Sequence, residues 1–200
     1  MKYLHPSESG FSLVETLVAI TILLVVIVGP MSISSSAARS TSFASEQVIA
    51  FFLAQEGAEL VQKGRDDLLL RTFLDSSDGN YLADPWSVFT DDSASGRYED
   101  CYTTSGCGLE LNTDSTGTLK TPIACTGTNC DLFFSATGER SRYTHEDSGT
   151  EDTPFSRIVF LSPVDDRSVR VVSRVYWRTG SQRAVQQVEV ETYLFNVYEN

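Results

Sequence analysis

A long uncharged run dominates the beginning of the chain. No ionisable side chain lies between Glu15 and Arg39, and residues 16–33 are almost wholly aliphatic. About 20 helical residues at ~1.5 Å each are enough to cross a hydrocarbon layer of ~30 Å. The pattern therefore predicts a membrane-spanning helix. The pair Gly29-Pro30 lies inside it, and proline removes one backbone hydrogen bond, so a kink or local melting is expected there.

An amphipathic pattern follows the apolar run. From residue 40 to about residue 70, apolar residues recur at spacings of three, four or seven, which mark one face of a helix. They are Ala44, Val48, Phe51, Ala54, Ala58, Val61 and Leu68. We expect this face to pack on the rest of the protein. On the opposite face, Glu59 and Lys63 have the favourable order for an ion pair.

The last third of the chain alternates between apolar and polar positions. Residues 157–161, 168–178 and 184–195 are rich in Val, Tyr, Phe and Arg with period two, which predicts antiparallel strands. In the middle segment, Val171 and Trp177 belong to the face that we expect to be buried. The polar residues between them belong to the face in water.

The last two of these strands are predicted to form one hairpin, 168–195. Thr179-Gly180-Ser181-Gln182 lies between them, and glycine suits the first central position of a type II′ turn. A two-residue turn here would place Arg170 opposite Glu191 and Val171 opposite Val190.

The middle of the chain lacks long apolar segments. Residues 75–154 are rich in Ser, Thr, Gly and Asp, so we expect mostly loops, with short strands at 108–111 and 131–135. The 200 residues allow one head domain of ordinary size beside an extended helix. The predicted fold class is therefore α+β, with a long amino-terminal helix packed on a small antiparallel β-sheet.

The flanks of the apolar run suggest how the chain is processed. A Gly10-Phe11 junction precedes the run, whereas an ordinary secretory signal is cut at small residues after it. Ser36-Ala37-Ala38 offers a small-residue cleavage site of this kind, and a cut there would make residues 1–38 a discarded signal. A second alternative is a single-pass membrane anchor that is not cut at all. We favour a cut between Gly10 and Phe11, which leaves the apolar helix on the mature protein.

The junction and the run together resemble a known signature. Gly10-Phe11-Ser12-Leu13-Val14-Glu15, followed by the apolar run, resembles the cleavage and methylation motif of type IV prepilins and type II secretion pseudopilins. The resemblance implies that a prepilin peptidase cuts after Gly10 and methylates the new amino terminus at Phe11. It also implies that Glu15 pairs with the amino terminus of a neighbouring subunit. Residues 53–61 and the predicted hairpin look similar to minor I/V-type members of this group.

The resemblance implies four segments. They are a leader at 1–10, the transmembrane part of the helix at 11–33, its amphipathic outer part at 34–74, and a β-rich head at 75–200. The implied partners are the peptidase, other pilin or pseudopilin subunits and a membrane assembly platform. The implied location is a single-pass membrane protein with its head outside the cytoplasm, and later a periplasmic or extracellular filament.

The four cysteines all follow the apolar helix in sequence. They are Cys101, Cys107, Cys125 and Cys130. Outside the cytoplasm disulfides persist, and four cysteines allow three connectivities, of which we favour the two local pairs, 101 with 107 and 125 with 130. A four-cysteine zinc site is the alternative, but only the second pair approaches the short spacing of a zinc knuckle.

The remaining polar residues do not indicate an enzyme. His145 lies in a polar run and is expected to be a solvated loop residue, so a buried Ser-His-Asp relay is not indicated. Asp147-Ser148-Gly149-Thr150 is expected to be a turn rather than part of an aspartic-protease dyad. Asp75 and Asp78 miss the EF-hand spacing and are expected to cap turns, with calcium binding as the alternative. No cofactor or metal is predicted.

The charge of the chain excludes one class of partner. The formal charge is −12, with 15 basic residues scattered among 27 acidic ones, which argues against nucleic acid. The sequence therefore predicts a structural protein: a minor subunit of a type IV pilus or of a type II secretion pseudopilus. The alternative is a membrane-tethered or filament-tip adhesin whose acidic loops bind a ligand.

Overall fold

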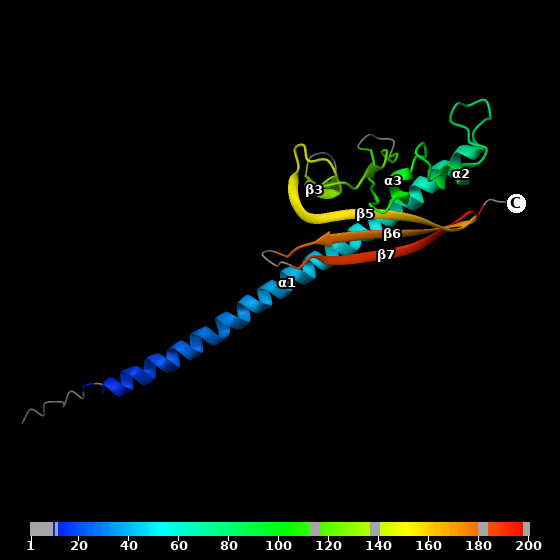
Figure 1. The fold of residues 1–200 in the computed structure, drawn as a ribbon. Coiled ribbons are helices and arrows are strands. Elements are labelled where there is room, and N and C mark those ends of the chain that lie inside the picture. The colour runs from blue at the N-terminus through cyan, green and yellow to red at the C-terminus, as the bar shows by residue number, and fades with distance from the viewer. Residues whose placement is uncertain (1–9, 11, 113–116, 137–140, 180–183, 198–200) are drawn as a thin grey trace, which may run out of the picture. The chain divides into compact units, whose positions relative to one another are not determined.

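The computed structural model describes residues 10, 12–112, 117–136, 141–179 and 184–197, and the chain divides into two compact units, 1–44 and 45–200. Helix α1 (Leu13–Leu70) begins in the first unit and ends in the second. In the second unit it packs against an antiparallel β-sheet (Figure 1). The predicted α+β class is confirmed.

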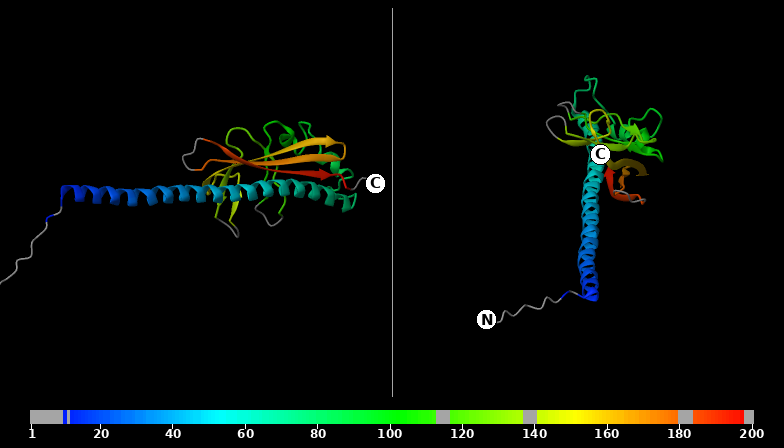
Figure 2. Two further views of the ribbon diagram at one scale, coloured as in Figure 1. Left: turned by 90° about the horizontal axis from the view of Figure 1, so that it is seen from below. Right: turned by 90° about the vertical axis from the view of Figure 1, so that its left-hand side faces the viewer.

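The sheet is organised around its longest strand, β5 (Glu151–Asp165). One edge of β5 pairs with β6 (Ser168–Trp177), which in turn pairs with β7 (Gln186–Phe195). The opposite edge pairs with β3 (Asp131–Ser135) and, further along, with β1 (Cys107–Gly108). Two short outer strands complete it, β4 (Arg142–Thr144) on β3 and β2 (Ile123–Ala124) on β1. Figure 2 shows β5, β6 and β7 lying side by side along the second half of α1.

Three short helices follow α1 in sequence, before the first strand of the sheet. They are η1 (Arg71–Phe73), α2 (Pro85–Phe89) and α3 (Glu99–Tyr102). Helix α2 begins where Asp84 Oδ1 accepts a hydrogen bond from Ser87 N, a typical amino-terminal cap. The predicted strand at 131–135 is confirmed as β3. Of the strand predicted at 108–111, only Gly108 belongs to a strand.

The buried face of α1 differs from the predicted one. Ala54, Ala58, Val61 and Leu68 are buried as expected, but Val48 and Phe51 are 56% and 47% exposed. The prediction was wrong there because it followed large apolar residues, whereas the observed face also includes Gly57 and Gly64. These glycines allow close packing.

Close contact explains why glycine occupies both positions. A Cβ added to Gly57 would lie 2.2 Å from Ser173 Oγ on β6, and one added to Gly64 would lie 2.4 Å from the Tyr98 hydroxyl. Glycine lowers helix stability by roughly 1 kcal/mol relative to alanine. Here that cost is offset by closer packing of the helix against β6 at Gly57 and against Tyr98 at Gly64.

The hairpin of β6 and β7 forms in a different register from the predicted one. Arg170 pairs with Tyr193 and Val171 with Thr192, two positions away from the expected partners. The last pair before the connection is Trp177 with Gln186, so the connection is longer than a two-residue turn. The predicted turn at 180–182 lies outside the described residues. A shift of two preserves the faces, because strand side chains alternate with period two.

Two predicted ion pairs have different outcomes. Arg170 does meet Glu191, at 2.5 Å, although the two residues are diagonal neighbours rather than directly opposite. The expected pair of Glu59 with Lys63 does not form. Lys63 instead bonds to Asp67 one turn further along, at 3.0 Å, and Glu59 accepts a hydrogen bond from Gln55.

Candidate processing and assembly segment

The predicted processing site lies at the start of α1. Gly10 is exposed and precedes the helix, and apart from its chain neighbours no atom of the described residues lies within 4 Å of the position that a Cβ would occupy. Phe11 lies outside the described residues. The helix begins with Thr16 N donating to Ser12 O at 3.1 Å. Gly10 thus precedes the first turn, which begins at Leu13.

Glu15 occupies the first turn of α1 and is exposed. The unpaired N–H groups of a helix amino terminus favour a nearby negative charge. It is also the last acidic residue before the uncharged run. Its carboxylate is thus placed at the edge of the apolar surface, close in sequence to the predicted new amino terminus.

The apolar residues after Glu15 are uncovered. From Leu13 to Ile33 the large aliphatic side chains are exposed, Val25 by 74% and Leu24 by 54%. Among the described residues, one helix, from Leu13 to Phe73, is long and apolar enough to cross a membrane. An exposed apolar surface of this extent marks a segment that lies in a membrane or packs against other proteins.

The helix continues without interruption through Gly29 and Pro30. The predicted local melting is therefore not observed. Because Pro30 has no N–H, the carbonyl of Val26 lacks the hydrogen bond that it would otherwise accept within the helix. Thr16 and Thr21 bond their hydroxyls back to helix carbonyls at 2.9 and 2.8 Å, which hides these polar groups within the apolar run.

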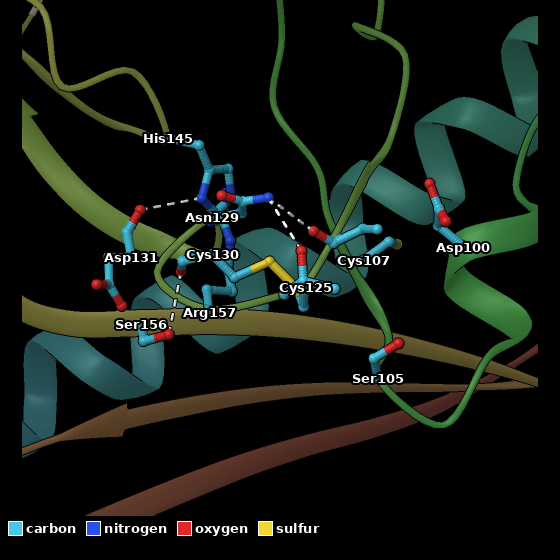
Figure 3. Close-up of a disulfide and its surroundings, with 12 residues drawn as sticks. Asp100, Ser105, Cys107, Cys125, Asn129, Cys130, Asp131, His145, Ser156 and Arg157 are labelled. Carbon is cyan, nitrogen blue, oxygen red and sulfur yellow. Dashed lines mark hydrogen bonds between the residues drawn. A yellow bond between two sulfur atoms is a disulfide. The ribbon is translucent and has the colours of Figure 1, made fainter.

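In the head, the two disulfides lie next to each other. The structure joins Cys101 to Cys107 and Cys125 to Cys130, the two local pairs favoured from the sequence. Strands β1 and β2 bring them together, since Cys107 pairs with Ala124, beside Cys125. Figure 3 shows the second disulfide close to β5, where Cys130 O accepts hydrogen bonds from the Arg157 backbone N–H and the Ser156 hydroxyl. The disulfides tie the central loops to the sheet.

A buried arginine connects α1 to the sheet. Arg157 lies on the inward face of β5 and is 1% exposed. Its guanidinium donates to Glu56 Oε2 at 2.6 Å and to two carbonyls, those of Leu53 at 3.3 Å and Leu109 at 2.8 Å. This role was not predicted from the sequence. The available signal was an arginine at an inward position of an alternating strand, between Phe155 and Val159.

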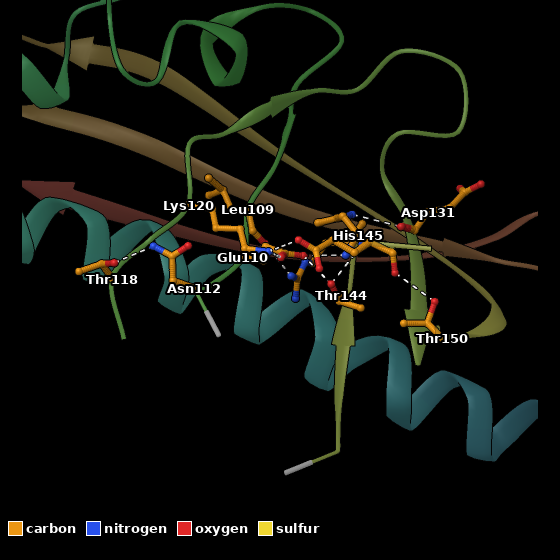
Figure 4. A network of polar contacts seen from close by, with 11 residues as sticks. Leu109, Glu110, Asn112, Thr118, Lys120, Asp131, Thr144, His145 and Thr150 are labelled. Atoms are coloured by element: carbon orange, nitrogen blue, oxygen red, sulfur yellow. Dashed lines mark hydrogen bonds and ion pairs between the residues drawn. The ribbon is translucent and has the colours of Figure 1, made fainter. Parts of the chain in front are cut away.

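A polar network surrounds Glu110 (Figure 4). Its carboxylate accepts hydrogen bonds from Lys120 Nζ, from Thr144 Oγ1 at 2.9 Å and from His145 N at 2.7 Å. Burial by itself would raise the pKa of Glu110, but these hydrogen bonds outweigh burial and lower it. Lys120 also reaches Glu146 at 2.5 Å. The network joins the loop segments at Glu110 and Lys120 to the end of β4.

His145 is half-buried and its ring is turned away from solvent, so its predicted role as a solvated loop residue is wrong. Its Nδ1 lies 3.1 Å from Asp131 O, and its Nε2 is buried without a hydrogen-bond partner among the described residues. Burial, reinforced by the charge of Arg157, lowers the pKa of His145 to about 4. The ring is therefore neutral near pH 7.

The other candidate polar motifs form turns. Asp75 Oδ1 accepts from Ser77 N, and Asp78 Oδ1 accepts from Asn80 N, both at 2.9 Å. The Asp147-Ser148-Gly149-Thr150 segment turns at Gly149, whose φ is 74°. In the part of the chain that the structure describes, no group of three His, Cys, Asp or Glu side chains could hold a metal ion.

Comparison with known proteins adds one finding. Residues 6–29 match the model of the prokaryotic N-terminal methylation motif. The match covers Gly10, Phe11 and Glu15, and it extends into the uncovered apolar part of α1. No curated protein and no solved structure matches the chain.

Proposed function

We propose that this chain, which carries the prepilin-type cleavage and methylation motif, is a minor structural subunit of a type IV pilus or a type II secretion pseudopilus. The observation that carries the proposal is the coincidence of three features at 6–29: the matched motif, an exposed Gly10 before the helix, and an uncovered apolar α1 after it. An α+β head in which α1 packs on an antiparallel sheet agrees with a pilin-like subunit.

Processing follows from the position of Gly10. A prepilin peptidase cuts between Gly10 and Phe11 and methylates the amino group of Phe11. Because the cut precedes the apolar run, the mature protein keeps its anchor. Before assembly the chain is a single-pass membrane protein with its head outside the cytoplasm, and after assembly it belongs to a periplasmic or extracellular filament.

Assembly depends on the exposed helix and on Glu15. A carboxylate drawn into the bilayer is costly, at roughly 2.5 to 3.5 kcal/mol near the centre, unless a cation compensates it. The methylated amino terminus of a neighbouring subunit supplies that cation. Other subunits therefore cover the apolar surface, and a membrane platform brings them together.

Mass analysis of the amino-terminal peptide tests this proposal. The mature chain is expected to begin at N-methylated Phe11, and Gly10→Val should leave the precursor uncut. Ser12→Ala, which leaves the junction glycine in place, is the matched control and should be processed normally. A mature terminus at Arg39, or an uncut Met1 in the wild type, contradicts the proposal.

A further inference from the structure

A cavity of about 610 Å³ opens beside the end of α1 in the head. This is a typical volume for a ligand site. The charged side chains that line it are Lys63, Asp67, Arg71 and Arg97. Three of these four are basic, although the whole chain has 15 basic residues against 27 acidic ones. Positive charge is therefore concentrated at this cavity, against the trend of the molecule.

The two arginines are held in place but keep free donors. Arg71 donates through Nε to Asn80 O at 2.6 Å, and Arg97 donates through Nη2 to Leu119 O at 3.0 Å. Within the described residues, the two Nη atoms of Arg71 have no hydrogen-bond partner, whereas the Arg97 side chain also lies close to the hydroxyl of Tyr98. Lys63 is paired with Asp67. Backbone carbonyls thus orient two guanidinium groups without neutralising them, and guanidinium groups bind carboxylates strongly, often through two hydrogen bonds.

The floor and rim of the cavity are apolar. Leu68 and Leu119 form part of the floor and are each 4% exposed, while Leu70 and Leu74 on the rim are 63% and 40% exposed. The one aromatic lining residue, Tyr98, is 1% exposed, and Arg97 lies over its ring at 5.9 Å. Among the described lining residues there is therefore no open aromatic face on which a sugar ring could stack.

We propose that this cavity binds an acidic peptide segment of a partner protein. A carboxylate side chain of the segment bonds to Arg71 and Arg97, and a neighbouring apolar side chain packs on Leu70 and Leu74. The charge of the cavity selects carboxylates, the exposed leucines select an apolar neighbour, and the covered tyrosine disfavours an acidic polysaccharide.

Fluorescence anisotropy with a labelled peptide of alternating glutamate and leucine tests the proposal. The full-length chain is used in nonionic detergent, and empty micelles give the blank. The glutamate peptide should bind about tenfold more tightly than its glutamine counterpart. Arg71→Gln and Arg97→Gln should each weaken binding by about tenfold, and added salt should weaken it further. Arg178→Gln, at an exposed arginine outside the cavity, is the matched control and should bind as the wild type does.

Several outcomes would overturn the proposal. Equal affinity for the glutamate and glutamine peptides would exclude carboxylate recognition. An equal loss in Arg178→Gln would show a general charge effect. An oligogalacturonate that displaces the peptide at lower concentration, with the same dependence on Arg71, would assign the site to acidic sugars. Arg97→Gln also removes a bond to Leu119 O, and Arg71→Gln removes one to Asn80 O, so each variant is first compared with the wild type by urea unfolding. If both variants unfold, the glutamate and glutamine peptides on the wild-type chain decide the question.

Discussion

At the scale of single residues, the guanidinium of Arg157 has one ionic partner and two carbonyl partners. The ionic partner, Glu56, keeps 48% of its side chain exposed, whereas the side chain of Arg157 is 1% exposed. Loss of the Glu56 charge would therefore leave a buried cation with carbonyl oxygens alone. A buried charge without its partner destabilises a protein strongly, although the exposure of Glu56 moderates the effect.

Glu56→Gln tests the importance of this pair. The free energy of unfolding of the head should fall by about 1 to 3 kcal/mol. Urea unfolding of the full chain in detergent measures it, because both tryptophans, Trp86 and Trp177, are buried in the head and report its unfolding. Glu59→Gln, on the same helix, should change stability by less than about 0.5 kcal/mol. Equal effects of the two variants would contradict a special role for Arg157.

The half-buried His145 predicts an acid-dependent loss of stability. Its pKa is lowered from 6.5 to about 4 in the folded head, so below pH 6.5 the unfolded chain binds a proton that the folded chain does not. The contribution of His145 to stability should therefore fall by about 3 kcal/mol as the pH drops from about 6.5 to about 4, and below that pH only the carboxylates add further loss. Urea unfolding at a series of pH values measures this slope.

His145→Gln is the control for the dependence of the unfolding free energy on pH, because glutamine does not titrate. The variant should lose part of the pH dependence between 4 and 6.5, while the contribution of the carboxylates at lower pH remains. The charged groups that face His145 are Glu110, Lys120 and Arg157, and they are unchanged in the variant. If the unfolding free energy depends on pH equally in the variant and the wild type, the pKa of His145 is the same in the folded and the unfolded chain.

At the scale of elements, the packing of α1 in the head depends on two glycines seven residues apart, Gly57 against β6 and Gly64 against Tyr98. Helix propensity alone ranks glycine poorly, so the sequence suggests that Gly57 and Gly64 weaken the helix. In the structure both glycines instead favour the packing of the helix, because each faces a side chain at close range. The buried face of α1 is rotated relative to the predicted one. The prediction relied on hydrophobicity, which identifies large apolar residues but not the small residues that allow close approach.

Gly57→Ala tests this packing. The new Cβ would lie 2.2 Å from Ser173 Oγ and 3.1 Å from Arg157 Cδ, so the head should be destabilised by about 1 to 3 kcal/mol despite the better helix propensity. Ser173→Ala alone should be close to neutral, because that hydroxyl is buried without a partner among the described residues. The double variant should recover part of the loss. A stabilised Gly57→Ala would show that the helix sits further from the sheet.

In the hairpin, the faces of the strands could be predicted from the sequence, but the register between the strands could not. The alternation of β6 and β7 was predicted correctly, and so was the inward face that carries Val171 and Trp177. The register was not, because it depends on the length of the connection and on cross-strand contacts such as Val171 with Thr192. A shift by two leaves the faces unchanged, so the hydrophobic pattern cannot detect it.

At the scale of the whole molecule, Glu15 is expected to decide whether the processed chain enters a filament. Glu15→Gln keeps the size and polarity of the side chain but removes a charge-assisted bond worth roughly 1.5 to 3 kcal/mol. Processing and membrane insertion should continue, and the processed protein should accumulate in the membrane. The measurement is the amount of tagged variant in sheared filaments relative to wild type at equal expression.

A second variant controls for effects on the helix itself. Ser12→Ala changes a neighbouring polar residue without removing a charge, and it should enter filaments as the wild type does. If Glu15→Gln is incorporated equally, the carboxylate is dispensable and the apolar residues 16–33 alone drive assembly.

The sequence by itself determined the features that are local or periodic. The uncharged run between Glu15 and Arg39, the Gly10-Phe11 junction and the alternation of the last strands each follow from a short stretch of chain, because helices and strands impose their periods on neighbouring residues. The α+β class and the prepilin-type motif could both be predicted on these grounds.

The tertiary structure alone decided which distant residues meet. Arg157 bonds to Glu56, 101 positions away, and a Cβ at Gly57 would clash with Ser173 on β6. The Nε2 of His145 is buried beside Gly108, which no local pattern connects to it. The charged cavity combines Arg71 with Arg97 from separate segments. These contacts depend on how the helix and sheet pack. Packing is fixed by the shapes of all the side chains at the interface, which a hydrophobic pattern does not specify.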